Sequence, residues 1–209
     1  MEPLDIRLAD LTGKARIRHA ALRLFAANGY AQTSLRAIAH AADVSLALIT
    51  HHFGSKHQLR DAIDKWVLAT FERAAGDALC RHDARAATKA FAVFVEHVGD
   101  ILRARPEVRA YLRRMAVVDG SPNGANLIGS MLGLIRRVIE HEQPLADERG
   151  RSEQSLQWLL LLFGPALLEP VLRRCLPDGA VEAGASARVV PFAAPPGGLA
   201  PETRHVAGF

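Results

Sequence analysis

The chain has 209 residues, of which 49% are hydrophobic, so it has enough apolar surface for a core and falls outside the compositional class of disordered proteins. Aromatic residues make up only 6%, and the core must therefore be built mainly from aliphatic side chains. The formal net charge is +4, and residues 1–60, with eight Lys or Arg against four Asp or Glu, carry all of it; this permits a nucleic-acid partner without requiring one.

A first amphipathic helix is predicted after a polar arm at residues 1–12. From Lys14 onward, apolar residues recur at the spacing of one helical face, and Asn28–Gly29 should end the helix because glycine takes a positive φ at low cost. A second helix follows, capped by Thr33 or Ser34. The apolar positions of these two helices are Ile17, Ala20, Ala21, Leu24 and Phe25, then Leu35, Ile38, Ala39 and Ala42.

A short third helix is predicted directly after a tight turn. The turn is Ala42–Val44, and Ser45 is the expected cap. Residues 46–53 then form a helix that directs Ile49 and Phe53 into the core, because positions four apart share one face.

A fourth helix begins almost at once. Gly54 ends the third helix, and Ser55 caps the fourth, with Gln58 three residues later as in a capping box. The apolar spacing predicts that this helix runs to about Ala78.

The rest of the chain also predicts helices. They are expected over 86–104, 106–118, 123–142 and 152–176, the last capped by Ser152. Pro165 and Pro170 fall inside the last helix, and each costs about 3 kcal/mol unless the chain adapts. Beyond it, residues 177–209 are rich in Ala, Gly and Pro without a period, which predicts a mostly disordered tail.

Two short helices joined by a tight turn form the helix-turn-helix pattern, whose second helix enters the major groove of DNA. The segment from Arg16 to Ile63, RIRHAALRLFAANGYAQTSLRAIAHAADVSLALITHHFGSKHQLRDAI, resembles the N-terminal DNA-binding domain of the TetR family of bacterial repressors. The matching features are LFAANGY at the end of the first helix, the TS cap, the IA step, VS before the recognition helix and HFGSK after it. The rest of the chain agrees with the family only in length and helical content.

DNA contacts are predicted at helix ends and on the outer face of the third helix. Thr33, Ser34 and Arg36 stand at a helix N-terminus, which favours a phosphate. Lys56 begins a helix whose dipole opposes its charge, and the resemblance implies a phosphate contact there. The third helix is expected to meet base edges, thymine methyl groups and phosphates through Ser45, Leu46, Ala47, Leu48, Thr50, His51 and His52.

Each of these roles has a plainer alternative. Thr33 and Ser34 can be simple caps, Arg36 a solvated surface residue, and either Leu46 or Leu48 can pack against the first helix.

Two departures from the family pattern weaken the expected contacts with DNA. Asp43 stands where glycine is usual and adds a negative charge near DNA, and the recognition face carries few hydrogen-bonding side chains. Specificity would then rest partly on DNA shape.

The resemblance implies an all-α fold with a helix-turn-helix domain over 1–60, a larger helical ligand-binding and dimerisation domain over 61–176, and the tail. In the family the last two helices pair with their symmetry mates, and here these are 123–142 and 152–176, the second apolar nearly all round. A homodimer would read a palindromic operator of double-stranded DNA, with half-sites about 34 Å apart.

A pocket for a small hydrophobic or aromatic effector, either neutral or anionic, is expected between helices four to eight. Ordinary core packing is the alternative for each of its residues. The expected lining is Trp66, Phe91, Phe94, Met115 and Met131, with His97 or Arg113 as polar anchors.

Other functions have little support in the sequence. It contains none of the nucleophile, metalloprotease, phosphate-loop or nucleotide-binding motifs, so no enzyme activity and no cofactor are expected. Cys80 and Cys175 lack metal-ligand spacing, and the adjacent His51 and His52 point about 100° apart, so no metal is expected either. A nucleoid protein would need a longer basic stripe, which leaves a helical ligand-binding dimer with weak or lost DNA binding as the main alternative.

The compartment is predicted from two absences. The N-terminus has no signal pattern, and the longest apolar run, Trp158–Leu168, is too short to span a bilayer. A cytoplasmic protein without membrane contact is therefore expected.

Overall fold

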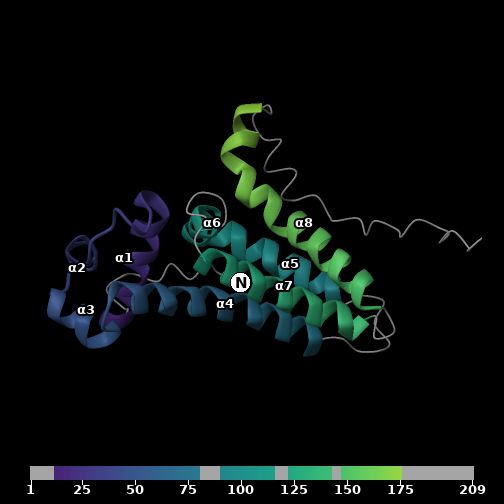
Figure 1. The fold of residues 1–209 in the computed structure, drawn as a ribbon, viewed down its shortest axis with the longest axis horizontal. Helices are drawn as coiled ribbons and strands as arrows, with labels where there is room; N and C mark the ends of the chain where they lie inside the picture. Colours follow the sequence, from purple (N-terminus) through teal and green to yellow (C-terminus); the bar gives the residue numbers. More distant parts are fainter. Residues whose placement is uncertain (1–11, 81–89, 116–121, 143–146, 176–209) are drawn as a thin grey trace, which may run out of the picture.

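The computed structural model describes residues 12–80, 90–115, 122–142 and 147–175, and within them the chain is helical without strands (Figure 1). The predicted all-α class is confirmed. The helices are α1 (Gly13–Asn28), α2 (Leu35–Ala42), α3 (Leu46–Phe53), α4 (Lys56–Cys80), α5 (Ala90–Ala104), α6 (Pro106–Arg113), α7 (Pro122–Glu142) and α8 (Glu148–Cys175).

The long helix α4 connects two groups of helices. In Figure 1, α1, α2 and α3 gather at its N-terminal end, and α5 and α7 lie along the rest of it. α8 packs against α7, and α6 packs against α1. One continuous set of buried apolar side chains runs from Ile17 in α1 to Phe163 in α8. The expected division of the chain near residue 60 therefore stays a prediction.

The packing inside the first group follows the predicted apolar faces. Ile17, Phe25, Ile38 and Ile49 are all at most 1% exposed, and they seal α1, α2 and α3 against one another. Leu24 and Leu35 are only half-buried, while Leu22, which the predicted stripe omitted, is fully buried.

Most helix ends agree with the predicted signals. Gly29 and Gly54 have φ values of +87° and +73°, a region that favours glycine, and the Ser55 hydroxyl accepts from the Gln58 N–H. Ser34, rather than Thr33, is the cap of α2.

The last helix departs from the prediction at its start. Ser152 lies inside α8, and its hydroxyl donates to the Glu148 carbonyl, so the predicted Ser152 cap is wrong. The first turn is closed by Asp147, whose carboxylate accepts the Gly150 N–H at 3.0 Å. α8 continues through Pro165 and Pro170 to Cys175.

Several predictions lie outside the described residues. These are most of the N-terminal arm, the first four residues of the helix expected at 86–104, the end of the one expected at 106–118, and all of the tail.

Candidate nucleic-acid interface

The turn between α2 and α3 is built by backbone geometry and two serine caps. Ser34 and Ser45 each accept an N–H three residues later, from Ala37 at 3.1 Å and from Leu48 at 3.2 Å. Between the helices, Asp43 adopts φ 52° and ψ 56°, a left-handed conformation that favours glycine. The reversal leaves the N-terminus of each helix at an exposed serine.

α3 has one face in the core and another at the surface. Ile49 is 1% exposed and Phe53 is 7% exposed, so both anchor the helix as predicted. The outer residues Ala47, Thr50 and His51 are exposed, and so is Leu46. A helix held from one side in this way presents its other side to a partner.

Leu48 does not belong to the outer face. It is half-buried, packs against the core, and its Cδ2 lies 3.4 Å from where a Cβ on Gly13 would stand. The alternative in which one leucine packs against the first helix is therefore the one observed, while Leu46 stays 39% exposed.

The polar residues of α3 differ in how exposed they are. The Thr50 hydroxyl donates to the Leu46 carbonyl at 3.2 Å, which leaves its lone pairs on the exposed side. His51 is exposed, whereas His52 is half-buried between His51 and Phe53, with ring centroids 5.3 Å and 6.3 Å away.

Thr33 is a structural residue, and its burial contradicts the predicted contact of its side chain with a phosphate. The side chain is 2% exposed, and its hydroxyl donates to the Gly29 carbonyl at 2.8 Å, with the Leu24 carbonyl at 3.3 Å. It joins the end of α1 to the start of α2. The neighbouring Arg36 is exposed on the first turn of α2, which fits either a phosphate contact or a solvated side chain.

Lys56 is held beside the start of α2 rather than extended into solvent. Its ammonium donates to the Ala31 carbonyl at 3.3 Å and lies 4.4 Å from the centre of the Tyr30 ring. Burial lowers the pKa of Lys56 from its usual value. The hydrogen bond to Ala31 and the contact with the Tyr30 ring fix the Lys56 ammonium near the N-terminal turn of α4.

Sequence reasoning missed a second cation at the same aromatic ring. Arg60, one turn after Lys56, is 5% exposed, and its guanidinium carbon lies 4.5 Å from the Tyr30 ring centre. The available signal was the i, i+4 spacing of Lys56 and Arg60 on one helical face.

Most of the residues predicted to line an effector pocket are packed in the core. Phe91, Phe94, Met115 and Met131 are at most 8% exposed, and the ring centroids of Phe91 and Trp158 lie 4.2 Å apart at a tilted angle, so these four belong to the packed core. His97 is half-buried on α5.

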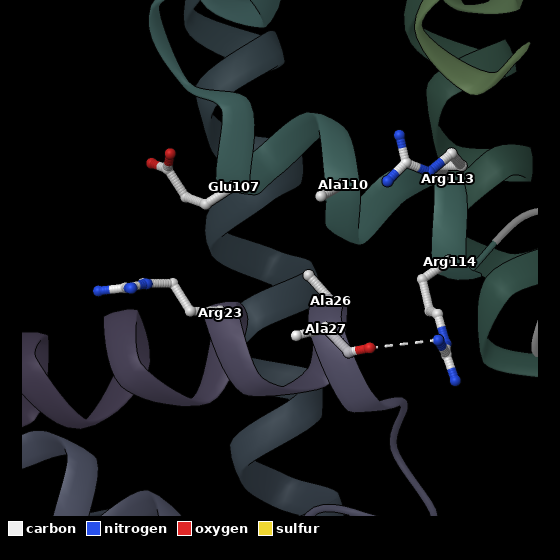
Figure 2. A pocket seen from close by; sticks show the side chains of 7 residues that line it. All are labelled: Arg23, Ala26, Ala27, Glu107, Ala110, Arg113 and Arg114. Atoms are coloured by element: carbon white, nitrogen blue, oxygen red, sulfur yellow. Dashed lines mark hydrogen bonds between the residues drawn. The ribbon is translucent and has the colours of Figure 1, made fainter. Parts of the chain in front are cut away.

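Trp66 and Arg113 lie elsewhere, at the junction of the two helix groups. Trp66 is flanked by the guanidinium groups of Arg18 and Arg105, 4.9 Å and 5.3 Å from its ring centre. Arg113 lines a cavity between α1 and α6 (Figure 2). The helical spacing of the sequence predicted which residues face inward, but it did not predict which of them line the same cavity.

In the part of the chain that the structure describes, no group of three or more His, Cys, Asp or Glu side chains is arranged to hold a metal ion. Within the same ranges, none of the helices combines the length and hydropathy needed to cross a bilayer.

Comparison with known proteins gives matches to both sequence and fold. Residues 17–63 match the model of the bacterial regulatory proteins of the tetR family. The HTH-type transcriptional regulatory protein RaaS of Mycobacterium tuberculosis is 34% identical over 147 residues, which are 70% of this chain. The match spans 61% of the length of RaaS.

Solved structures share the fold at low sequence identity. A TetR transcriptional regulator from Legionella pneumophila superposes with a TM-score of 0.64 at 19% identity, covering 84% of this chain and 94% of that one. The fatty acid degradation regulator FadR from Bacillus halodurans gives 0.64 at 14% identity, covering 88% and 97%. These likenesses extend through the helices that follow the matched segment and establish the fold.

Proposed function

Since this chain belongs to the TetR family of bacterial regulatory proteins, we propose that it is a transcriptional regulator, most simply a repressor, which binds a palindromic operator as a homodimer. The observation that carries the proposal is that α3 is buried on one face and exposed on the other. Its Ile49 and Phe53 are buried while Leu46, Ala47, Thr50 and His51 are exposed, so a helix anchored from behind offers a short face of two apolar and two polar side chains to the major groove.

Backbone contacts are proposed for the helix ends that flank this face. Ser34 and Ser45 stand at helix N-termini, and Arg36 and Lys56 add positive charge. Phosphates are favoured at such ends by free N–H groups and by the helix dipole. These contacts would position α3, while Thr50, His51 and the methyl groups of Leu46 and Ala47 would read the bases.

Dimerisation is proposed through α7 and α8. Four leucines of α8 are half exposed or more, an apolar surface that monomers rarely leave open on one helix. They are Leu156 (51%), Leu160 (60%), Leu161 (52%) and Leu168 (50%). Two copies joined here would present two α3 helices to successive half-sites, as a palindrome requires.

Effector control is proposed through the helices of the second group. Because Phe91, Phe94 and Trp158 are packed against one another, a small hydrophobic ligand would bind among them only by separating these rings. In one conformation of the dimer the two α3 helices fit successive half-sites, and in another they do not. A ligand that binds the second conformation more tightly lowers operator affinity, to an extent set by the ratio of its affinities for the two conformations.

The test is selection of bound duplexes from a random pool, followed by competition binding at fixed salt. A regulator should select one palindromic sequence and prefer it over random DNA by at least about 1,000-fold. A selected site without two-fold symmetry would contradict the dimeric part of the proposal. Absence of any preference, together with a stable dimer, would favour the ligand-binding dimer that has lost DNA binding.

Two lysines supply a matched control for the same assay. Lys56→Ala should weaken binding to all sequences and lower the salt slope by about one, because one phosphate contact is lost. Lys65→Ala, which removes an exposed lysine further along α4, should leave both quantities unchanged. Equal effects of the two changes would show that Lys56 contributes only general charge.

A further inference from the structure

Arg60 is a buried cation near the start of α4. Its side chain is 5% exposed, and its Nε has no hydrogen-bond partner among the residues that the structure describes. Two neighbours compensate its charge. The guanidinium carbon lies 4.5 Å from the centre of the Tyr30 ring, and the carboxylate of Asp64, one turn later on α4, interacts with it electrostatically.

Stability alone gives no reason for an arginine at this position. Replacing a buried ion pair by apolar side chains of similar volume is often neutral or stabilising. A methionine at position 60 would fill a comparable volume without a charge to desolvate. What the guanidinium adds, and methionine does not, is an attractive contact with the face of the Tyr30 ring.

The same Tyr30 ring carries the ammonium of Lys56. That ammonium lies 4.4 Å from the ring centre and donates one N–H to the Ala31 carbonyl at 3.3 Å. The ring also packs against Phe25 of α1, with ring centroids 5.4 Å apart. An ammonium has three N–H donors, so two remain for a phosphate. The flexible lysine side chain is therefore already held in one position in the protein without DNA.

We propose that Arg60 is a positioning residue for DNA binding, which holds the Tyr30 ring so that the ring holds the Lys56 ammonium in place for a backbone phosphate. The inference rests on the proposed function, to which the phosphate contact of Lys56 belongs. Ordering a long side chain on binding lowers affinity. Lys56 is ordered beforehand, so the complex avoids this loss. Arg60 itself is too buried to meet a phosphate.

Operator affinity and its salt dependence separate positioning from direct contact. Arg60→Met should weaken operator binding about fivefold, a typical effect of having to order one long side chain. The salt slope should not change, because Lys56 still reaches its phosphate. A slope lower by about one would mean that Arg60 contacts a phosphate itself, and it would overturn the proposal. Arg73→Met makes the same change at an exposed position of α4 and should affect neither quantity.

A second variant keeps the test valid if Arg60→Met fails to fold, since that change leaves the Asp64 carboxylate without its neighbouring cation. Arg60→Met combined with Asp64→Asn removes both charges and keeps an acceptor for the Tyr111 hydroxyl. Urea denaturation verifies that the double variant folds, and its operator affinity should again be about fivefold lower. Full operator affinity in the folded double variant would contradict the role of Arg60.

Further variants test whether Arg60 acts through Tyr30 and Lys56. Tyr30→Leu should lose about as much operator affinity as Arg60→Met, and Tyr30→Phe should restore most of it because phenylalanine keeps the ring face. In a Lys56→Ala background, Arg60→Met should cause no further loss, since the residue that it positions is gone. An equal loss in both backgrounds would show that Arg60 acts independently of Lys56.

A measurement without DNA separates this inference from the proposed function. The chain has four lysines, so carbon-13 labelling of lysine gives a simple NMR spectrum in which Lys56→Arg identifies the Lys56 signal. The ε-methylene protons of Lys56 should show an upfield ring-current shift from Tyr30, which Tyr30→Leu abolishes and Arg60→Met reduces.

The two possible failures then look different. An unchanged Lys56 shift in Arg60→Met would overturn the inference even in a chain that binds its operator. A chain that selects no operator would remove the proposed function, and the lysine spectrum would still decide whether Arg60 fixes Lys56.

Discussion

Asp43 shows how a single residue affects both the turn and the expected contact with DNA. Among the described residues it is the one non-glycine with positive φ, at the C-terminal end of α2. Its negative charge is also at the C-terminal end of α2, the negative end of the helix dipole. Asp43→Gly should raise the free energy of unfolding by about 1 kcal/mol, because the left-handed conformation no longer strains a side chain. Urea denaturation measures this change.

Asp43→Asn is the matched variant, because asparagine also tolerates the left-handed region but carries no charge. It should stabilise the fold less than glycine does. Both variants should tighten DNA binding at low salt to a similar extent, since each removes the same negative charge. Tighter binding by the glycine variant alone would assign the effect to backbone geometry instead.

At the scale of one element, the two leucines of α3 separate recognition from packing. Leu46 is 39% exposed, so Leu46→Ala should change stability by less than about 0.5 kcal/mol while altering the preferred bases. Leu48 is half-buried near Gly13 of α1, so Leu48→Ala should lower stability by roughly 1–2 kcal/mol. Thermal unfolding and repeated operator selection distinguish the two, and the reverse ranking would contradict the assigned faces.

The contact between α4 and α6 predicts a pH dependence of stability. The Tyr111 hydroxyl donates to Asp64 Oδ1 at 2.6 Å, and burial raises the pKa of Asp64 although the Tyr111 bond and Arg60 oppose the shift. The folded state therefore binds the proton of the Asp64 carboxyl group more tightly than the unfolded chain does. Asp64 therefore contributes stability that is fully present below the unfolded pKa, about 3.9, and is lost as pH rises through the higher folded value.

Asp64→Asn should remove this loss, since the amide oxygen still accepts from Tyr111 without titrating. The difference in unfolding free energy between the variant and the original chain should grow with pH from about 4 upward, as followed by urea titrations at a series of pH values. Tyr111→Phe should shift the same window to higher pH. A constant difference would mean that Asp64 titrates alike in both states.

The helices were predictable from sequence because their signals are local. The caps at Ser34, Ser45 and Ser55 each lie next to the N–H that they accept, and periodicity fixes the inner face of α3. The inward orientation of the Thr33 hydroxyl was not predictable from its cap signal, because one of its two acceptors, the Leu24 carbonyl, lies nine residues earlier and becomes close only once the chain reverses after α1.

The effector pocket was the least predictable part, for a physical reason. Periodicity states which side of a helix turns inward but not which helix that side meets. Trp66 meets Arg18 of α1, and Arg113 faces α1 across the cavity, because α6 packs on α1. That packing depends on small residues such as Ala26 and Ala110, which carry no distinct signal of their own.

At the scale of the whole molecule, the exposed leucines of α8 predict a dimer that one charge can disrupt. If two copies pair through α8, Leu160→Glu places a carboxylate in the apolar interface twice, once from each copy. Burying an unpaired charge costs several kcal/mol, so the dimer dissociation constant should rise at least about 100-fold. Sedimentation velocity over a concentration series measures this change. Ala92→Glu adds the same charge at an exposed position of α5 and should leave the dimer intact.

A monomer cannot span two half-sites, so Leu160→Glu should also lose most of its preference for the palindrome while α3 keeps its fold. An original chain that sediments as a monomer throughout the series, or a Leu160→Glu variant that dimerises as tightly as the original, would exclude α8 as the interface.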